Sequence, residues 1–286
     1  MLVWFIVFIL LCIFVAVVSS IADNNRFIVS DHELTSDKIK KDCTIAFLSD
    51  LHSNSFGKGN IKLIEAVKAS KPDIIIMGGD MVTSIAGETE EKRMDIAVNL
   101  TKALSDYRIY YGIGNHEYRM FLYREDFEDN FDILMRRLKE NGVHVLRNEK
   151  EHIDEFNIDI QGLEIERRYY KRGIKVIMED DYLTSLIDKP DPESFRILMA
   201  HNPEFFEQYA KVADLVLSGH FHGGIVRLPF VGGVISSRLS LFPKYDGGRY
   251  DEYGAAMIVS RGLGSHTIPL RVFNPCELCV IKLKKI

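Results

Sequence analysis

Short runs of β-branched and other apolar residues alternate with helical stretches from residue 43 onward. Leu63, Ala66 and Val67 are three and four positions apart, as on one face of a helix. Apolar stripes with this spacing recur in 94–104 and 126–140. The runs predict strands at CTIAFL (43–48), DIIIM (73–77), RIYYGI (108–113), RILMA (196–200), ADLVLS (213–218), AAMIVS (255–260) and LCVIKL (278–283). This order is typical of an α/β domain with buried, largely parallel strands.

Five of the predicted strands are followed by residues that can bind a metal ion. These residues are Asp50 and His52, Asp80, Asn115 and His116, His201, and His220 with His222. Each has an ordinary explanation when taken alone: Gly-Asp is a turn signal, and Asn is a good N-cap. The carboxyl ends of strands are where sites form in open α/β sheets. The recurrence of these residues at one structural position therefore predicts a shared metal site.

The composition of this set indicates which ions it would hold. Without His116 it comprises two carboxylates, four imidazoles and one amide oxygen. Such mixed ligands suit Mn, Fe, Zn, Co or Ni rather than an all-oxygen calcium cage. Seven ligands predict two divalent ions about 3.5–4 Å apart, bridged by a shared carboxylate. Two ions, two carboxylates and one hydroxide leave a charge of about +1, which predicts an anionic substrate such as a phosphate ester.

The first 22 residues carry no charged side chain and predict a single transmembrane anchor. At 1.5 Å per residue, a helix of this length matches a hydrocarbon core of about 30 Å. The rival interpretation is a signal peptide cut after Ala22, but no Lys or Arg precedes the apolar run. By the positive-inside rule, the basic residues that follow place the catalytic domain in the cytoplasm. Residues 23–41 predict a polar linker, and residues 42–286 a catalytic domain.

Charge and cysteine content exclude other classes. The formal net charge of −5 shows no basic excess, so we expect no nucleic-acid partner. Cys276 and Cys279 form a lone C-x-x-C, without the second pair that a zinc ribbon needs. Residues three apart in a strand point to opposite faces, which favours two packing thiols. Residues 148–182 predict no single element, and residues 230–254 predict a long Gly/Ser-rich connection that is functional or mobile.

The strand-end motifs taken together resemble those of the calcineurin-like metallophosphoesterases. The matching blocks are SDLHS (49–53), GGD (78–80), GNHE (114–117), MAHNPE (199–204) and SGHFHGG (218–224). Later stretches are similar to the bacterial membrane-associated branch, which includes enzymes like UDP-2,3-diacylglucosamine pyrophosphatases: VRLP (226–229), VSRGLG (259–264) and NPCEL (274–278). The resemblance implies two packed mixed β-sheets flanked by helices, with a dimetal site at the strand ends.

The resemblance also implies a role for each strand-end residue. The first metal would be held by Asp50, His52 and His222, and the second by Asn115, His201 and His220. Asp80 would bridge the two metals. His116 would not be a ligand; it would contact the phosphate and assist the leaving group.

These observations predict a dimetal-dependent phosphohydrolase that cleaves a phosphoester or phosphoanhydride by attack of a metal-bridging hydroxide. An anchored enzyme would act on a phosphorylated small molecule or a lipid-linked substrate at the membrane. The loop 230–254 carries apolar and basic residues that either touch the bilayer or pack beneath the loop: Leu239, Leu241, Phe242, Arg238 and Lys244. Arg227, Arg261 and Arg271 are the expected phosphate or head-group contacts.

Two departures and two alternatives accompany this prediction. Phe221 stands where many relatives carry Thr, and Ile225 where many carry Gln, so the substrate rim is expected to differ. One alternative is a phosphodiesterase of soluble nucleotides or nucleic acid. The other is a non-catalytic membrane scaffold, which would have lost one or more of the seven ligands; none is missing.

Overall fold

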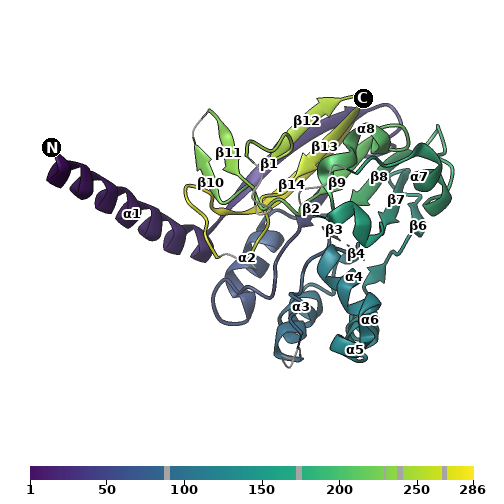
Figure 1. The fold of residues 1–286 in the computed structure, drawn as a ribbon. Helices are drawn as coiled ribbons and strands as arrows, with labels where there is room; N and C mark the ends of the chain where they lie inside the picture. The colour runs from purple at the N-terminus through teal and green to yellow at the C-terminus, as the bar shows by residue number, and fades with distance from the viewer. Residues whose placement is uncertain (87–90, 172–175, 229, 237–240, 266–268) are drawn as a thin grey trace.

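The computed structural model describes residues 1–286 except 87–90, 172–175, 229, 237–240 and 266–268. Two six-stranded mixed sheets pack face to face, and helices cover their outer faces (Figure 1). The first sheet has the order β1 (Phe27–Ser36), β14 (Cys276–Lys285), β2 (Cys43–Leu48), β3 (Ile74–Met77), β4 (Arg108–Tyr111), β5 (His144–Val145). The second has the order β12 (Gly248–Glu252), β13 (Ala255–Val259), β9 (Leu215–Ser218), β8 (Phe195–Ala200), β7 (Ile158–Leu163), β6 (Lys150–Ile153). The α/β class predicted from the alternating pattern is confirmed.

The helices lie in two outer layers, apart from α1 (Leu2–Asn25), which projects from the domain (Figure 1). The first sheet is covered by α2 (Ile61–Ala69), α3 (Glu91–Ala103), α4 (Asn115–Leu122), α5 (Arg124–Phe127) and α6 (Asn130–Glu140), with the 3-10 turn η1 (Lys58–Asn60). The second is covered by η2 (Arg167–Tyr170), α7 (Asp180–Leu186), η3 (Pro203–Phe205) and α8 (Phe206–Tyr209). A short hairpin, β10 (Val226–Leu228) with β11 (Gly232–Ile235), stands apart from both sheets.

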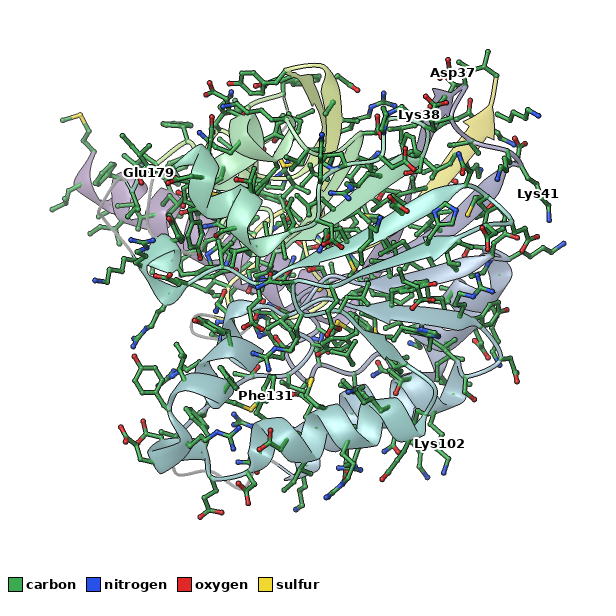
Figure 2. All side chains as sticks on the ribbon, turned by 90° about the vertical axis from the view of Figure 1, so that its right-hand side faces the viewer. Asp37, Lys38, Lys41, Lys102, Phe131 and Glu179 are labelled. Atoms are coloured by element: carbon green, nitrogen blue, oxygen red, sulfur yellow. The ribbon has the colours of Figure 1, made fainter. Side chains whose placement is uncertain are left out.

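The alternation of side chains along each strand builds three apolar layers. Ile45 and Phe47 face the second sheet, where Ile197 belongs to the same buried cluster. Ala46 and Leu48 point the other way, toward the helices. Phe131 of α6, labelled in Figure 2, belongs to the same buried cluster on that side. Because both faces of the central strands are covered, the strands read in the sequence as continuous apolar runs.

Two segments differ from the sequence prediction. The stretch 23–41, expected to be a linker, contains β1, which pairs in parallel with β14 from Phe27 to Ser36. This strand lies at the edge of the sheet with one face in solvent, so polar residues alternate along it. For that reason its sequence did not predict a strand. The connection 230–254 contains β11 and β12 rather than one long loop. Of the loop residues singled out, Arg238 and Leu239 lie outside the described residues.

The lysines beyond β1 belong to the folded domain. Lys38 pairs with Asp214 at 2.7 Å and Lys41 with Glu155 at 2.5 Å, at the edge of the domain shown on the right of Figure 2. The C-x-x-C pair behaves as predicted: all four cysteines are free thiols. Cys276 packs in the helix-side core and Cys279 in the core between the sheets.

Candidate metal centre

The carboxyl ends of strands from both sheets bring the predicted ligands together. Asp50 and Asp80 follow β2 and β3, and Asn115 opens α4 after β4. His201 follows β8, and the pair His220 and His222 follows β9. Their potential ligand atoms form three groups, in each of which all atoms lie within 4.8 Å of one another: Asp50, His52 and His222; His52, Asp80 and His116; Asp80, His201 and His220.

The two carboxylates lie at the centre of this arrangement. The Oδ1 atom of Asp50 is 3.3 Å from Nε2 of His222 and 3.7 Å from Nε2 of His201. The Oδ2 atom of Asp80 is 3.1 Å from Nε2 of His201 and 3.8 Å from Nε2 of His52. Asp80 therefore lies close to imidazoles that follow strands of both sheets.

The backbone at the site is strained in a way that the sequence did not reveal. Five of the predicted ligands adopt left-handed conformations, with φ between 48° and 68°: Asp50, His52, Asp80, His220 and His222. Such a conformation costs a non-glycine residue about 1–3 kcal/mol and persists at functional sites because the surroundings enforce it. Gly114 and Gly219 lie against the carboxylates, and a Cβ at either position would collide with Asp80 or Asp50.

The histidine rings are held in orientations that suit metal binding. Nδ1 of His201 donates to the Gly78 carbonyl at 2.9 Å, and Nδ1 of His222 donates to the Gly264 carbonyl at 3.0 Å. Donation from Nδ1 leaves the Nε2 lone pair of a neutral ring facing the other ligands.

The charges of the site fit bound cations. Burial acts to lower the pKa of His201, but the charges of Asp80 and Asp50 outweigh it and raise that pKa to about 10. Burial raises the pKa of Asp50 to about 6. In the metal-free protein a proton thus supplies positive charge between the carboxylates. Among the described residues, the buried Oδ1 of Asn115 has no hydrogen-bond partner, which suits a ligand atom.

His116 differs from the other histidines in its hydrogen bonding. The backbone N–H of Ser84 donates to Nδ1 of His116 at 3.0 Å, so the proton of the neutral ring lies on Nε2. Burial lowers the pKa of His116, which favours the neutral ring. The backbone N–H of His116 also donates to Oδ1 of Asp80 at 2.8 Å. This side chain therefore presents an N–H donor, whereas neutral His201 and His222 rings that donate from Nδ1 present an Nε2 lone pair.

Glu117 is a site residue to which the sequence analysis gave no role. Its buried carboxylate accepts from the backbone N–H groups of Asp80 at 2.8 Å and Met81 at 2.9 Å, and from the Tyr111 hydroxyl at 2.7 Å. It also accepts from the N–H of Gly114 at 3.1 Å, the spacing of a capping box. Burial raises the pKa of Glu117 to about 7, whereas these donors stabilise its carboxylate. Glu117 thereby fixes the loop that carries Asp80.

Replacing Glu117 with glutamine is expected to weaken metal binding about 10–100-fold, as for other groups that support a ligand. The new amide N–H₂ would face N–H donors, so the loop after β3 would lose at least one hydrogen bond and the protein about 1–3 kcal/mol of stability. Titration calorimetry and thermal unfolding measure both effects. Glu125→Gln, at an exposed position of α5, is the matched control. Unchanged affinity in Glu117→Gln would contradict the positioning role.

The three arginines expected to contact the substrate have different surroundings. Arg227 pairs with Asp246 at 2.9 Å, and Nε of Arg261 lies 3.6 Å from Glu277. Arg271 is buried, and its guanidinium donates to the carbonyls of Gly264 at 2.6 Å and Arg261 at 2.8 Å. These contacts favour a structural role for Arg271 behind His222, in place of the expected substrate contact.

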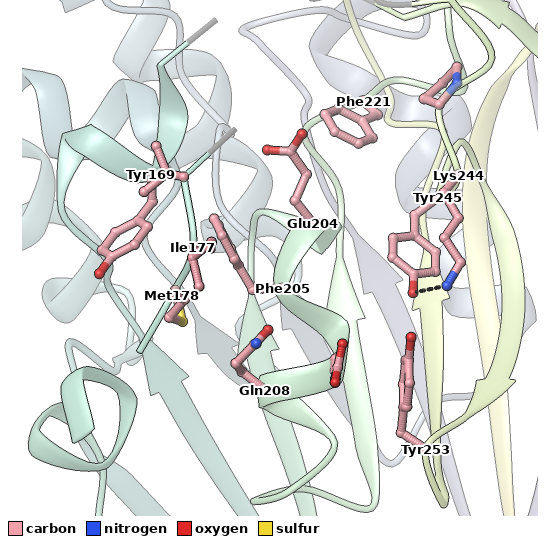
Figure 3. Close-up of a pocket in the computed structure, with 13 residues that line it drawn as sticks. Tyr169, Ile177, Met178, Glu204, Phe205, Gln208, Phe221, Lys244, Tyr245 and Tyr253 are labelled. Carbon is pink, nitrogen blue, oxygen red and sulfur yellow. Dashed lines mark hydrogen bonds between the residues drawn. The ribbon is translucent and has the colours of Figure 1, made fainter. Parts of the chain in front are cut away.

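A pocket of about 600 Å³ adjoins the site on the side of the second sheet. Phe221, between the ligand candidates His220 and His222, lies in its wall opposite Tyr169 and Met178 (Figure 3). Lys244 also lines it and donates to the Tyr245 hydroxyl at 2.7 Å. The aromatic side chain at position 221 thus lines a pocket beside the candidate metal centre.

Comparison with known proteins agrees with this geometry. The profile of the calcineurin-like phosphoesterase family matches residues 43–224, which include the seven predicted ligands. An uncharacterised metallophosphoesterase of Aquifex aeolicus is 28% identical over 90% of this chain and 91% of its own length. Another, from Helicobacter pylori, is 29% identical over 86% of this chain, which spans only 61% of that relative.

The family match covers more than half of the chain, and the enzyme class follows from it. Its members are phosphoester hydrolases that generally use a dinuclear metal site. The chain belongs to the calcineurin-like phosphoesterase family.

Proposed function

We propose that this protein is a dimetal-dependent phosphohydrolase that cleaves a phosphoester or phosphoanhydride. The observation that carries the proposal is the convergence of three ligand groups, of which the first two share His52 and the last two share Asp80. Asp50, His52 and His222 would hold one ion and Asn115, His201 and His220 the other, with Asp80 between them. Bound ions would neutralise the phosphoryl oxygens and lower the pKa of an attacking water.

The protein's own groups complete the reaction. The Nε2–H of His116 is placed to donate to a phosphoryl or leaving oxygen, because its Nδ1 is occupied by Ser84. Glu117 and the backbone N–H of His116 hold Asp80 in one orientation. The buried, strained loops keep this geometry fixed before substrate arrives.

A membrane location and a lipid-linked substrate are the finer parts of the proposal. The described structure has one helix long and apolar enough to cross a bilayer, Leu2–Asn25, and none of its apolar window is buried. That exposure argues against a core helix of a soluble protein. Cleavage after Ala22 would remove Ser19 and Ser20, whose side chains bond to the catalytic domain. These contacts favour a retained anchor over a cleaved signal peptide.

Removal of metal is expected to abolish hydrolysis, with recovery on adding back Mn²⁺. The physical reason is that the two carboxylates and the imidazoles supply no nucleophile of their own, and only metal lowers the pKa of water enough at neutral pH. The assay uses the purified full chain, an activated aryl phosphodiester and a chelator. Magnesium-free buffer without chelator is the control. Full activity of the stripped protein would refute the proposed function.

A further inference from the structure

The end of α1 is bonded into the catalytic domain beside the candidate metal centre. The Asn24 side-chain amide donates to the Pro269 carbonyl at 3.0 Å, and the backbone N–H of Asn274 donates to the Asp23 carboxylate at 2.8 Å. Asp23 is fully buried. The loop 269–274 that makes these bonds with α1 also carries Arg271, whose guanidinium donates to the Gly264 carbonyl behind His222. The last two turns of the helix are therefore hydrogen-bonded to the domain.

This attachment fixes the depth of the domain relative to a bilayer. If residues 1–22 cross the hydrocarbon core, the last turn of α1 lies in the layer of lipid head groups, which adds about 5–8 Å on each side. The loop 269–274 bonds to α1 on both sides of that boundary: the Pro269 carbonyl accepts from Asn24 at 3.0 Å, and the backbone N–H of Phe273 donates to Ser19 at 2.9 Å. The loop therefore lies where the hydrocarbon core meets the head groups.

A pocket of about 440 Å³ opens at this depth, between α1 and the metal centre. Six of its nine described lining residues carry an amide or hydroxyl: Ser20, Asn24, Asn25, Ser53, Asn54 and Ser265. His52, a member of two ligand groups, also lines it. The buried Oγ of Ser53 has no hydrogen-bond partner among the described residues, so it is available for a ligand.

Exposed apolar side chains lie on the loop that bonds to α1 and on the hairpin joined to that loop. They lie on the loop 269–274, on the β10–β11 turn and after β11: Leu270, Phe273, Phe230, Val231, Leu241 and Phe242. The bridge Val226–Val272 joins the hairpin to the loop, and the bridge Ile235–Leu241 joins the last two residues to the hairpin. Figure 1 shows the hairpin and the yellow loop on the side of the domain from which α1 emerges. Such a surface, continuous with a membrane helix, fits the acyl region of a bilayer.

We propose that this pocket binds the uncharged ester and hydroxyl groups of a membrane lipid, with the phosphate of that lipid toward His52. The neutral amides and hydroxyls suit those groups, and the chains would stay in the bilayer beside α1. The substrate class is thus a phosphoester lipid taken directly from the membrane. This assignment rests on the proposed function and specifies where its substrate binds.

The test is photolabelling of the full chain in phosphatidylcholine vesicles with phosphatidic acid that carries a diazirine beside the glycerol. Label is expected in the last turn of α1 or the loop 269–274, and free glycerol phosphate should not compete with it. Asn25→Trp replaces the amide of Asn25 and places a large ring in the pocket. Loss of one good hydrogen bond alone corresponds to a fall in labelling of about tenfold, which is the expected result. Asn25→Gln should restore labelling, and Asn99→Trp, at an exposed position of α3, should leave it unchanged.

Equal labelling of Asn25→Trp and wild type, or competition by free glycerol phosphate, would overturn the lipid site. A fall in Asn99→Trp as large as in Asn25→Trp would overturn it too. Hydrolysis of the soluble aryl phosphodiester by the wild type is measured on the same samples. Intact hydrolysis without specific labelling refutes only the lipid site, whereas absent hydrolysis refutes the proposed function whatever the labelling.

Discussion

Asp80→Asn is expected to lose metal-dependent hydrolysis by more than about 100-fold, since groups that only support a ligand already cost about 10–100-fold. The substitution keeps the size of the side chain, and its amide oxygen can still accept from the N–H of His116. It removes one of two buried negative charges at the centre. Neighbouring imidazoles, His201 foremost, hold the pKa of Asp80 well below its usual range despite burial, so wild-type Asp80 is ionised.

The measurement combines activity with metal content. Wild type should retain two ions per chain after gel filtration in Mn²⁺, and Asp80→Asn fewer than two. Asp106→Asn, at an exposed turn, should behave as wild type in both assays. Two tightly held ions and normal turnover in Asp80→Asn would show that this carboxylate bridges nothing.

Most of the fold could be predicted because its strands are buried on both faces. The runs at 43–48 and 196–200 are mostly apolar, and both form strands of nearly those bounds. The edge strand β1 could not be predicted, because only one of its faces is buried. Half of β1 faces solvent, so its sequence alternates and reads as a polar linker. The apolar stripe over 126–140 predicted one helix, but the structure has two, α5 and α6. The break lies at Glu128, where φ is 51°.

The candidate site divides in a similar way. The seven predicted ligands could be identified from the sequence because each follows the end of a predicted strand. The structure brings six of the seven into compact groups. The groups that orient them could not be found, because most are backbone atoms such as the carbonyls of Gly78 and Gly264. The sequence offered one indication of the role of Glu117: it stands three residues after Gly114, the spacing of a capping box. The docking of α1 had none, since it depends on a loop about 250 residues away in the chain.

His116→Ala is expected to separate turnover from metal binding. Loss of a positioned proton donor reduces the rate about 10²–10⁴-fold. Metal content should remain that of wild type, because the Nδ1 of His116 is occupied by the N–H of Ser84 and the bond from its own backbone N–H to Asp80 survives the substitution.

The leaving group decides between the possible roles of His116. If Nε2–H protonates the departing oxygen, the loss in His116→Ala shrinks as that oxygen becomes a better leaving group, since an activated aryl oxide needs no proton. If the ring only binds the phosphate, the loss is the same for aryl and alkyl esters and appears in KM. His144→Ala, at an exposed position of β5, controls for the loss of an imidazole. If His116→Ala loses its ions together with its activity, His116 is instead a ligand. The distance allows this, because a ring nitrogen of His116 lies within 4.8 Å of ligand atoms of His52 and Asp80. The hydrogen bond that Nδ1 accepts from Ser84 opposes it, because the proton of the neutral ring then lies on Nε2.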